Sequence, residues 1–256
     1  MTNINYVGLY TLIRKELLRF IRVPLQTIGS PVVTTVLYFA VFGASIGGRI
    51  GEVEGLSYTE FIMPGLIMMN VLMIAFTGIA SGIMLSKVWN TLTDILVTPL
   101  SNLEIILGFA LSSTIRSVVT ALLIYGTALF FIPFHVAHPI YLLTFVALVS
   151  FVFSLLGLIA GMWAVNFEQM TAFPTFVITP LSFLGGIFYS TAMLPPFFQT
   201  LSHYNPLLYT INGMRYGFYG VTDVHAGFAY GVLVVLLVVL MAVTLHLFKI
   251  GYKIRT

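Results

Sequence analysis

Long runs of apolar residues, separated by short polar segments, make up most of the chain. A helix needs about 20 apolar residues to cross the hydrocarbon core of a bilayer, and six runs reach or approach that length. We therefore predict an all-α membrane protein with about six transmembrane helices. The expected spans are residues 24–48, 60–86, 105–131, 139–165, 170–188 and 228–248.

The first 23 residues show a helical period of apolar and basic positions in place of an apolar run. One face of that helix carries Tyr6, Tyr10, Ile13, Leu17, Phe20 and Ile21. The opposite face carries Lys15, Arg19 and Arg22. This pattern predicts an amphipathic interfacial helix over residues 1–23 that lies flat on an anionic membrane surface. A charged tail that only anchors the first span is the alternative.

A polar segment, KVWNTLTDILVTPLSNLE at residues 87–104, interrupts the apolar pattern between the second and third spans. Its apolar positions Leu92, Ile95 and Leu96 share one helical face, and Thr98-Pro99 is a helix stop. We predict a short amphipathic helix at the membrane surface within residues 88–100. A loop this short and ordered is typical of a contact with another protein.

Between the fifth and sixth spans the chain is punctuated by glycine and proline and is rich in Tyr and Phe. Residues 189–220 are too polar and too broken to span a bilayer. We predict re-entrant or interfacial helices here, at the outer surface. Their aromatic side chains suit either a belt at the level of the lipid headgroups or a ligand-binding site.

Composition and charge agree with this class and give an orientation. The chain is 59% hydrophobic and 7% charged, whereas a soluble domain carries about 25% charged residues. With six spans, most basic residues fall in the two terminal segments and the 87–104 loop, which places both termini in the cytosol. The basic residues are too thinly spread to bind nucleic acid. No Asn-x-Ser/Thr glycosylation acceptor occurs, which favours a bacterial inner membrane.

Motifs for catalysis, metal binding and nucleotide binding are absent from the sequence. There is no cysteine, no G-x-x-x-x-G-K-[ST] loop and no H-E-x-x-H pair. Gly78-Ile79-Ala80-Ser81-Gly82 comes near a serine-nucleophile motif, but small residues in a span usually serve helix packing. We therefore predict no catalytic residue, no metal site and no cofactor bound by this chain.

Arg116 is the one ionisable residue that lies clearly within a predicted span, about eleven residues into the third. A charge at that depth is a candidate functional residue. It could equally extend toward the membrane surface or pair with Glu104 or Asp94. A carrier coupled to protons or ions needs carboxylates or histidines in its spans, and the pattern offers none before His246.

Three segments resemble parts of one known family. They are YTLIRKELLRFIRVP at 10–24, NTLTDILVTPLSNLEIILG at 90–108 and GGIFYSTAMLPPFFQTLSHYNPLLYTINGMR at 185–215. In order and character they are similar to the connecting helix, the coupling segment and the outer re-entrant helices of the type-2 ABC exporter permeases. The resemblance covers essentially the whole chain. This family includes exporters of O-antigen, teichoic acid, capsule, lipooligosaccharide and drugs.

The resemblance implies a permease that moves a hydrophobic or lipid-linked substrate out of the cytosol or the inner leaflet. Two copies would form a homodimer and pair with two ABC ATPase subunits, which would bind ATP and Mg²⁺. The chain itself would not be an enzyme. Membrane lipids are the other expected partner. A membrane scaffold or assembly protein without transport, and an ion-coupled secondary carrier, are the alternatives.

The same resemblance assigns candidate site residues. The coupling helix would contact the ATPase through Thr91, Asp94, Ile95, Leu96, Thr98 and Pro99. The connecting helix would contribute Arg14, Lys15, Glu16 and Arg19, and Glu168 in the NFEQ turn would form a second cytosolic contact. Spans one, two and five would line the substrate path, with the aromatic residues Tyr38, Phe39, Phe42, Phe176 and Phe183. Trp89 or Asn90 stands where the family usually has an acidic residue.

Overall fold

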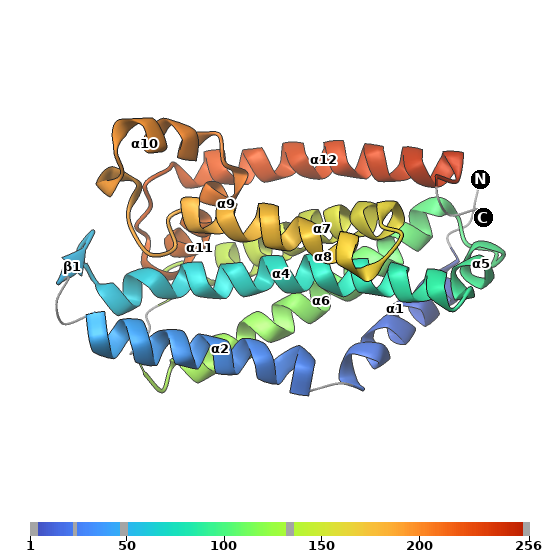
Figure 1. The fold of residues 1–256 in the computed structure, drawn as a ribbon, viewed down its shortest axis with the longest axis horizontal. Helices are drawn as coiled ribbons and strands as arrows, with labels where there is room; N and C mark the ends of the chain where they lie inside the picture. Colours follow the sequence, from blue (N-terminus) through green and yellow to red (C-terminus); the bar gives the residue numbers. More distant parts are fainter. Residues whose placement is uncertain (1–4, 23–24, 47–50, 132–135, 253–256) are drawn as a thin grey trace.

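The computed structural model describes residues 5–22, 25–46, 51–131 and 136–252, and these ranges form a bundle of helices with one small hairpin (Figure 1). Parts of two predicted elements lie outside the described residues: positions 1–4 and 23 of the interfacial helix, and positions 24, 47 and 48 of the first span.

Four helices of the described chain are long and apolar enough to cross a membrane. They are α4 (Tyr58–Val88), α6 (Asn102–Ala128), α7 (Pro139–Trp163) and α12 (Ala226–Ile250). They correspond to the second, third, fourth and sixth predicted spans. The prediction of an all-α membrane protein is therefore confirmed at the level of class.

The first and fifth predicted spans are helical but irregular. The first consists of η1 (Leu25–Gly29), α2 (Ser30–Tyr38) and η2 (Phe39–Ile46) in direct succession. The fifth consists of α8 (Phe167–Phe173), η3 (Pro174–Ile178) and α9 (Thr179–Leu184). The η segments named here have wider, π-helical turns. In the fifth, Pro174 and Pro180 cannot donate backbone hydrogen bonds, which interrupts the regular ladder.

Helix α4 lies at the centre of the bundle and packs most closely against α7. Gly157 of α7 lies directly against the backbone carbonyl of Phe76, and Gly161 lies against Ala80 one turn further along. Small residues at this spacing let two helix backbones approach closely. The α4–α7 contact is therefore a seam of backbone against backbone.

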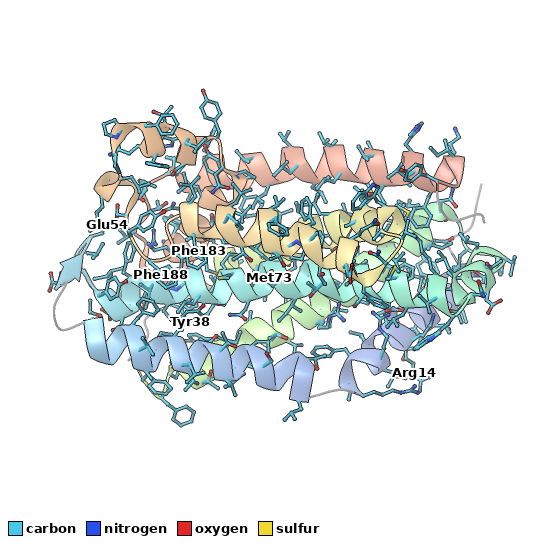
Figure 2. All side chains as sticks on the ribbon, viewed as in Figure 1. Arg14, Tyr38, Glu54, Met73, Phe183 and Phe188 are labelled. Atoms are coloured by element: carbon cyan, nitrogen blue, oxygen red, sulfur yellow. The ribbon has the colours of Figure 1, made fainter. Side chains whose placement is uncertain are left out.

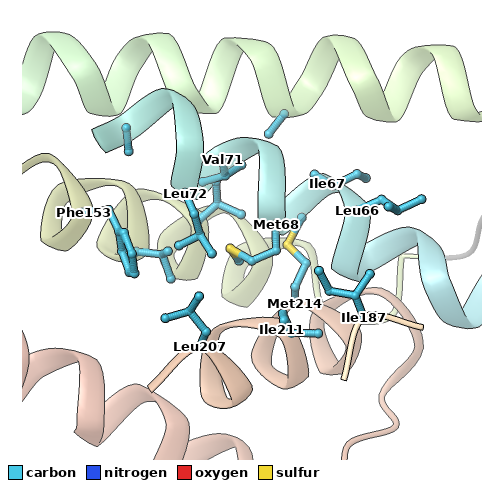
Figure 3. Packing of buried hydrophobic residues seen from close by; sticks show 14 of the residues in the cluster. Leu66, Ile67, Met68, Val71, Leu72, Phe153, Ile187, Leu207, Ile211 and Met214 are labelled. Carbon is cyan, nitrogen blue, oxygen red and sulfur yellow. The ribbon is translucent and has the colours of Figure 1, made fainter. Parts of the chain in front are cut away.

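A second packing partner of α4 comes from the segment between the fifth and sixth predicted spans. This segment forms η4 (Thr191–Met193), α10 (Pro196–His203) and α11 (Pro206–Tyr219). Leu207, Ile211 and Met214 of α11 belong to the same buried cluster as Leu66 and Met68 of α4 (Figure 3). Helix α11 also packs against α7 and α12, so it is embedded among the long helices.

Local sequence signals explain where the long helices begin and end. Ser57 and Glu60 form a capping box at the start of α4, and Ser101 and Glu104 form another at the start of α6. Each box satisfies backbone N–H groups that the first helical turn leaves unpaired. Helix α4 ends at Val88, and Asn90 then takes a left-handed conformation with φ 55°. Asn tolerates that conformation better than most residues.

Different elements lie at the two ends of the bundle (Figure 1). At one, the α5 end, helix α5 (Thr91–Leu96) lies near the start of α1 (Tyr6–Ile21) and the last turns of α12. At the other, the hairpin end, strands β1 (Glu52–Val53) and β2 (Leu56–Ser57) pair antiparallel, with Glu52 opposite Ser57. Helices α10 and α11 lie toward the hairpin end.

Candidate functional site

Helix α5 is attached to the bundle by the apolar face that the sequence pattern indicates. Leu92 and Ile95 are buried in a cluster with Leu12 of α1 and Phe109 of α6. The apolar face predicted from the sequence therefore packs against α1 and α6. Thr98 closes the helix by donating from its hydroxyl to the Ile95 carbonyl at 2.6 Å.

The N-terminal part of α1 ties the segment after α5 to the start of α6. The backbone N–H of Asn5 donates to the Glu104 carboxylate, and the Asn5 side chain donates to the Pro99 carbonyl at 3.4 Å. The same carboxylate accepts from the backbone and hydroxyl of Ser101, both at 2.6 Å. One glutamate thus joins three segments of the chain at the α5 end.

Lys87 provides a second link at this end, between α4 and α7. Its Nζ donates to the Met162 carbonyl and, at 3.2 Å, to the Ala164 carbonyl. These carbonyls lie at the C-terminal end of α7, where a cation also interacts favourably with the helix dipole. Helix α5 is therefore held in a frame that includes α1, α4, α6 and α7.

The outward side of this frame forms what we name the α5 surface: Trp89, Asp94, Val97, Thr98 and Pro99, all exposed. Trp89 is 65% exposed and Val97 is 78% exposed. Asp94, Thr98 and Pro99 were expected here from the sequence, whereas Trp89 and Val97 were not. The sequence did contain a signal for them, because Trp89 and Val97 are bulky apolar residues near the acidic Asp94 in a polar loop.

The other coupling-helix candidates are less accessible. Ile95 is 8% exposed, so its side chain serves the protein's own packing. Thr91 and Leu96 are half-buried. Because α5 has only six residues, the positions that face the bundle cannot also face a partner.

The connecting-helix candidates point in two directions. Arg14 and Lys15 are exposed, whereas Glu16 is buried and Arg19 turns inward. Arg19 Nη2 lies 2.9 Å from Glu16 Oε2 and donates to the Gly78 carbonyl of α4 at 2.9 Å. The expectation that Arg19 lies on the outer polar face of α1 is therefore wrong, because α1 packs along α6 and presents that position to α4.

A cavity of about 570 Å³ lies beside α4, between the α1–α2 connection and α8. Arg19 and Arg116 reach into it, and apolar side chains such as Met73 complete its wall. Its other polar lining residues include Thr34, Asn70, Thr77, Ser81 and Thr171. The described residues that line it include no Asp, Glu or His. Glu168 is exposed in the first turn of α8, just outside this lining.

An aromatic cluster joins the first and fifth predicted spans nearer the hairpin end (Figure 2). Phe188 lies 4.9 Å from Phe42, 6.1 Å from Tyr38 and 5.5 Å from Phe183 between ring centroids. Tyr38, Phe42 and Phe183 were path candidates from the sequence, and Phe188, the last residue of the fifth predicted span, is their common neighbour. These contacts hold α2 and η2 against α9.

The remaining two aromatic candidates lie elsewhere. Phe39 is buried in the core and stacks on Phe131 with ring centroids 6.0 Å apart. Phe176 is 77% exposed on the outside of η3. Helical rotation explains why Phe39 faces the core while Tyr38 faces the aromatic cluster, because successive residues are about 100° apart around the helix axis.

Arg116 is 8% exposed, and its guanidinium lies directly over Gly78. Its Nη2 donates to the Ser113 hydroxyl at 3.3 Å, and the group lies 5.5 Å from the Phe20 ring centroid. Among the described residues no carboxylate lies within ion-pair distance of it. The alternative of a pair with Glu104 or Asp94 is therefore wrong. Glu104 is held by Asn5 and Ser101 instead, and Asp94 is exposed on α5.

The hairpin end contains a second polar cluster. Asp223 accepts from the Thr191 hydroxyl at 3.0 Å and from Ser190 at 3.3 Å, and it shares a hydrogen bond with Glu54. Partial burial of its carboxyl group and that hydrogen bond raise the pKa of Glu54, although the residue as a whole is exposed. Burial alone would raise the pKa of Asp223 as well, but hydrogen bonds from Glu54 and Thr191 and the charge of Arg215 lower it on balance. The charge of each carboxyl group therefore affects the protonation of the other.

Replacing Glu54 by glutamine is expected to raise the unfolding midpoint at pH 7.5, by about 1–3 °C, and to leave it unchanged at pH 4. Because the pKa of Glu54 is raised in the fold, its stabilisation is present below the ordinary glutamate pKa and is lost as pH rises through the raised value. Glutamine stays neutral and removes that loss. Scanning fluorimetry at both pH values tests this, with Glu52→Gln, at the other exposed glutamate of the hairpin, as the control. Equal shifts in both variants contradict the assignment.

No group of three or more His, Asp or Glu side chains within the described part of the chain is placed to hold a metal ion.

Comparison with known proteins gives consistent matches over most or all of the chain. The family model described as ABC-2 type transporter matches residues 7–219. The chain is 41% identical, over the full length of both proteins, to the inner membrane transport permease YadH of Escherichia coli strain K12. It is 26% identical to nodulation protein J of Rhizobium leguminosarum bv. viciae over 92% of each chain, and 28% identical to that of Rhizobium meliloti over 90% of this chain and 87% of the relative. The matched range includes all of α1 but its first residue, the α5 surface and the cavity. This chain belongs to the ABC-2 type transporter family.

Proposed function

We propose that this chain, as the transmembrane subunit of an ABC transporter, is the permease of an exporter driven by a separate ATPase subunit that docks on the α5 surface. The observation that carries the proposal is the attachment of that surface. Its outward side chains are exposed, while the Asn5 side chain donates to its Pro99 carbonyl and the buried Leu92 and Ile95 pack α5 against α1 and α6. Lys87, just before α5 in the chain, ties the end of α4 to α7. A partner that moves α5 therefore moves helices that line the cavity.

The proposed topology places the α5 end in the cytosol of a bacterium. Six spans, the first and fifth irregular, would put both termini on that side and the hairpin, α10 and the re-entrant α11 on the outer side. The basic residues Arg14, Lys15 and Lys87 near the α5 end agree with the positive-inside rule. The word "inner membrane" in the name of the Escherichia coli relative supports the same location. A homodimer served by two ATPase copies, which hold ATP and Mg²⁺, completes the assembly.

The proposed substrate is hydrophobic or lipid-linked. The cavity combines polar side chains with an apolar wall, and the aromatic cluster of Tyr38, Phe42, Phe183 and Phe188 lies between it and the hairpin end. An amphiphile could place its polar group in the cavity and its apolar part along the outside of η3, where Phe176 is exposed. The absence of a carboxylate or histidine from the described cavity lining argues against an ion-coupled carrier.

Asp94→Arg and Val97→Glu are expected to release the ATPase while leaving the membrane protein folded. Both positions are exposed, so neither change disturbs packing, yet each puts an unfavourable charge into the proposed interface. The measurement is co-purification from the native membrane in mild detergent. Wild-type protein should bring down a P-loop ATPase in stoichiometric amount, and each variant should retain less than about one tenth of it, a loss of ~1.4 kcal/mol or more.

Glu52→Arg is the matched control, because it reverses an exposed acidic charge at the opposite end of the molecule. It should retain the ATPase fully. Purification of the wild-type chain alone, or with partners that are not ATPases, would overturn the proposal in favour of a membrane scaffold or assembly protein. ATP-dependent movement of a lipid-like substrate in vesicles excludes the scaffold.

A further inference from the structure

Two glycines one turn apart on α4 each make room for an arginine from a different helix. A Cβ at Gly78 would overlap the guanidinium of Arg116 from α6, and a Cβ at Gly82 would overlap that of Arg19 from α1. The small residues of the Gly78–Gly82 segment thus have a use besides helix packing. They bring two cations to the same stretch of α4, at the wall of the 570 Å³ cavity.

The charges around this pair do not balance. Glu16 lies 2.9 Å from Arg19 and offsets one positive charge. Arg116 has no carboxylate within ion-pair distance among the described residues, and its buried Nε has no hydrogen-bond partner there. Within the described lining, the groups that face the cavity are neutral apart from the two arginines. The pair and Glu16 together therefore carry one uncompensated positive charge.

Keeping such a charge inside a membrane-embedded bundle is costly, because the surroundings solvate it poorly. The sequence could have avoided that cost with an apolar residue at position 116. A guanidinium is planar and presents paired N–H donors, which match the oxygens of a phosphate. An anion in the cavity would supply both the missing charge and acceptors for unpaired donors, and Thr77 and Ser81 offer hydroxyl donors beside it.

We propose that this cavity is a binding site for the phosphate group of an anionic amphiphile, with Arg116 and Arg19 as its charged ligands. This inference deepens the proposed function, since it names the chemical class of the substrate's polar group. Its direct test is binding, which requires neither the ATPase nor transport. The site lies roughly 15 Å from the Val88 end of α4 at helical rise, within reach of a headgroup from the inner leaflet.

The experiment measures equilibrium binding of radiolabelled dodecyl phosphate to the purified full-length chain in a neutral detergent. Saturable binding is expected, at least tenfold tighter than that of the cation dodecyltrimethylammonium. A second arm uses inorganic phosphate. Weak or undetectable binding of that ion assigns the site to a lipid headgroup, whereas equal affinity assigns it to free phosphate and overturns the amphiphile part of the proposal.

Arg116→Gln and Arg19→Gln are each expected to weaken dodecyl phosphate binding by at least tenfold, and Arg116→Lys by less. Arg22→Gln, an exposed arginine one turn beyond Arg19, is the control and should bind as the wild type does. Unchanged binding in both glutamine variants overturns the site. If those variants do not fold, phenylglyoxal labelling of the wild type decides: dodecyl phosphate should protect Arg19 and Arg116, and absence of protection refutes the proposal.

The two proposals fail in different ways. If binding is saturable and depends on the arginines but no ATPase co-purifies, the anion site is supported and the exporter proposal is refuted. If an ATPase co-purifies but the chain shows no preference for dodecyl phosphate, the permease proposal is supported and the anion site is refuted.

Discussion

Leucine in place of Gly157 is expected to abolish the folded, monodisperse protein. A side chain at Gly157 would overlap the Phe76 carbonyl, which is a backbone atom in the middle of α4 and cannot rotate away. The two central helices would have to separate, and the buried cluster around Phe76 and Phe153 would open with them. Overpacking a core typically costs 1–3 kcal/mol, and a clash with backbone exceeds that range.

Size-exclusion chromatography of a fluorescent fusion in detergent measures this loss directly. Gly231→Leu is the matched control, because the space around Gly231 on α12 is open and the substitution is the same. The control should keep a sharp peak at the wild-type position. A sharp peak for Gly157→Leu as well would show that the α4–α7 seam tolerates separation, and the packing account would be wrong.

Arg215→Met is expected to lower the unfolding midpoint by about 5–12 °C, for a cost of ~2–4 kcal/mol. The Arg215 side chain is fully buried and lies 3.8 Å from the Phe61 ring centroid. It donates to the Gly186 carbonyl at 2.9 Å and to the Asn212 side chain at 3.2 Å. Methionine fills similar volume but takes away the Arg215 donor from the Gly186 carbonyl and from the Asn212 side-chain oxygen, which keeps its bond from the Asp223 N–H. It also removes the positive charge near Asp223.

Differential scanning fluorimetry of the purified protein measures the midpoint, and Arg22→Met, the same change at an exposed site, should shift it by less than about 2 °C. Similar shifts in both variants would mean that charge alone, and not the buried contacts of Arg215, determines the effect. The contacts hold the turn at Gly186, whose φ of 82° suits glycine, against the start of α4.

The long apolar runs allowed the four regular membrane helices to be predicted, because length and hydropathy are properties of the sequence itself. The 87–104 segment was predicted for a similar reason: its charges, its apolar face and its proline act over a few residues. The helix predicted there is α5, and its apolar positions Leu92 and Ile95 are the ones that face inward. Their contacts with α1 and α6 could not be predicted, because tertiary packing is not encoded in the local sequence pattern.

The sites were less predictable than the spans. Arg19 was expected outward from the periodicity of α1, but periodicity gives the relative directions of side chains and not which direction faces the protein. Arg116 could be recognised as unusual from the sequence. Its packing against Gly78 could not be predicted, since the two residues are 38 positions apart and on different helices. Phe39 and Phe42 look equivalent in sequence, yet only Phe42 joins the aromatic cluster.

Helix α1, together with its N-cap residue Asn5, contacts both candidate sites. Asn5, at its start, is bonded to the segment beside the α5 surface, and Arg19, about four turns later, is bonded to α4 at the cavity wall. A helix of this length moves nearly as a rigid body, so a tilt that displaces one end displaces the other. Under the proposed function, a partner on the α5 surface would act on the cavity through α1, without a relay through the spans. By thermodynamic reciprocity, if such a partner changes the affinity of the cavity for a ligand, that ligand changes the affinity of the α5 surface for the partner by the same factor.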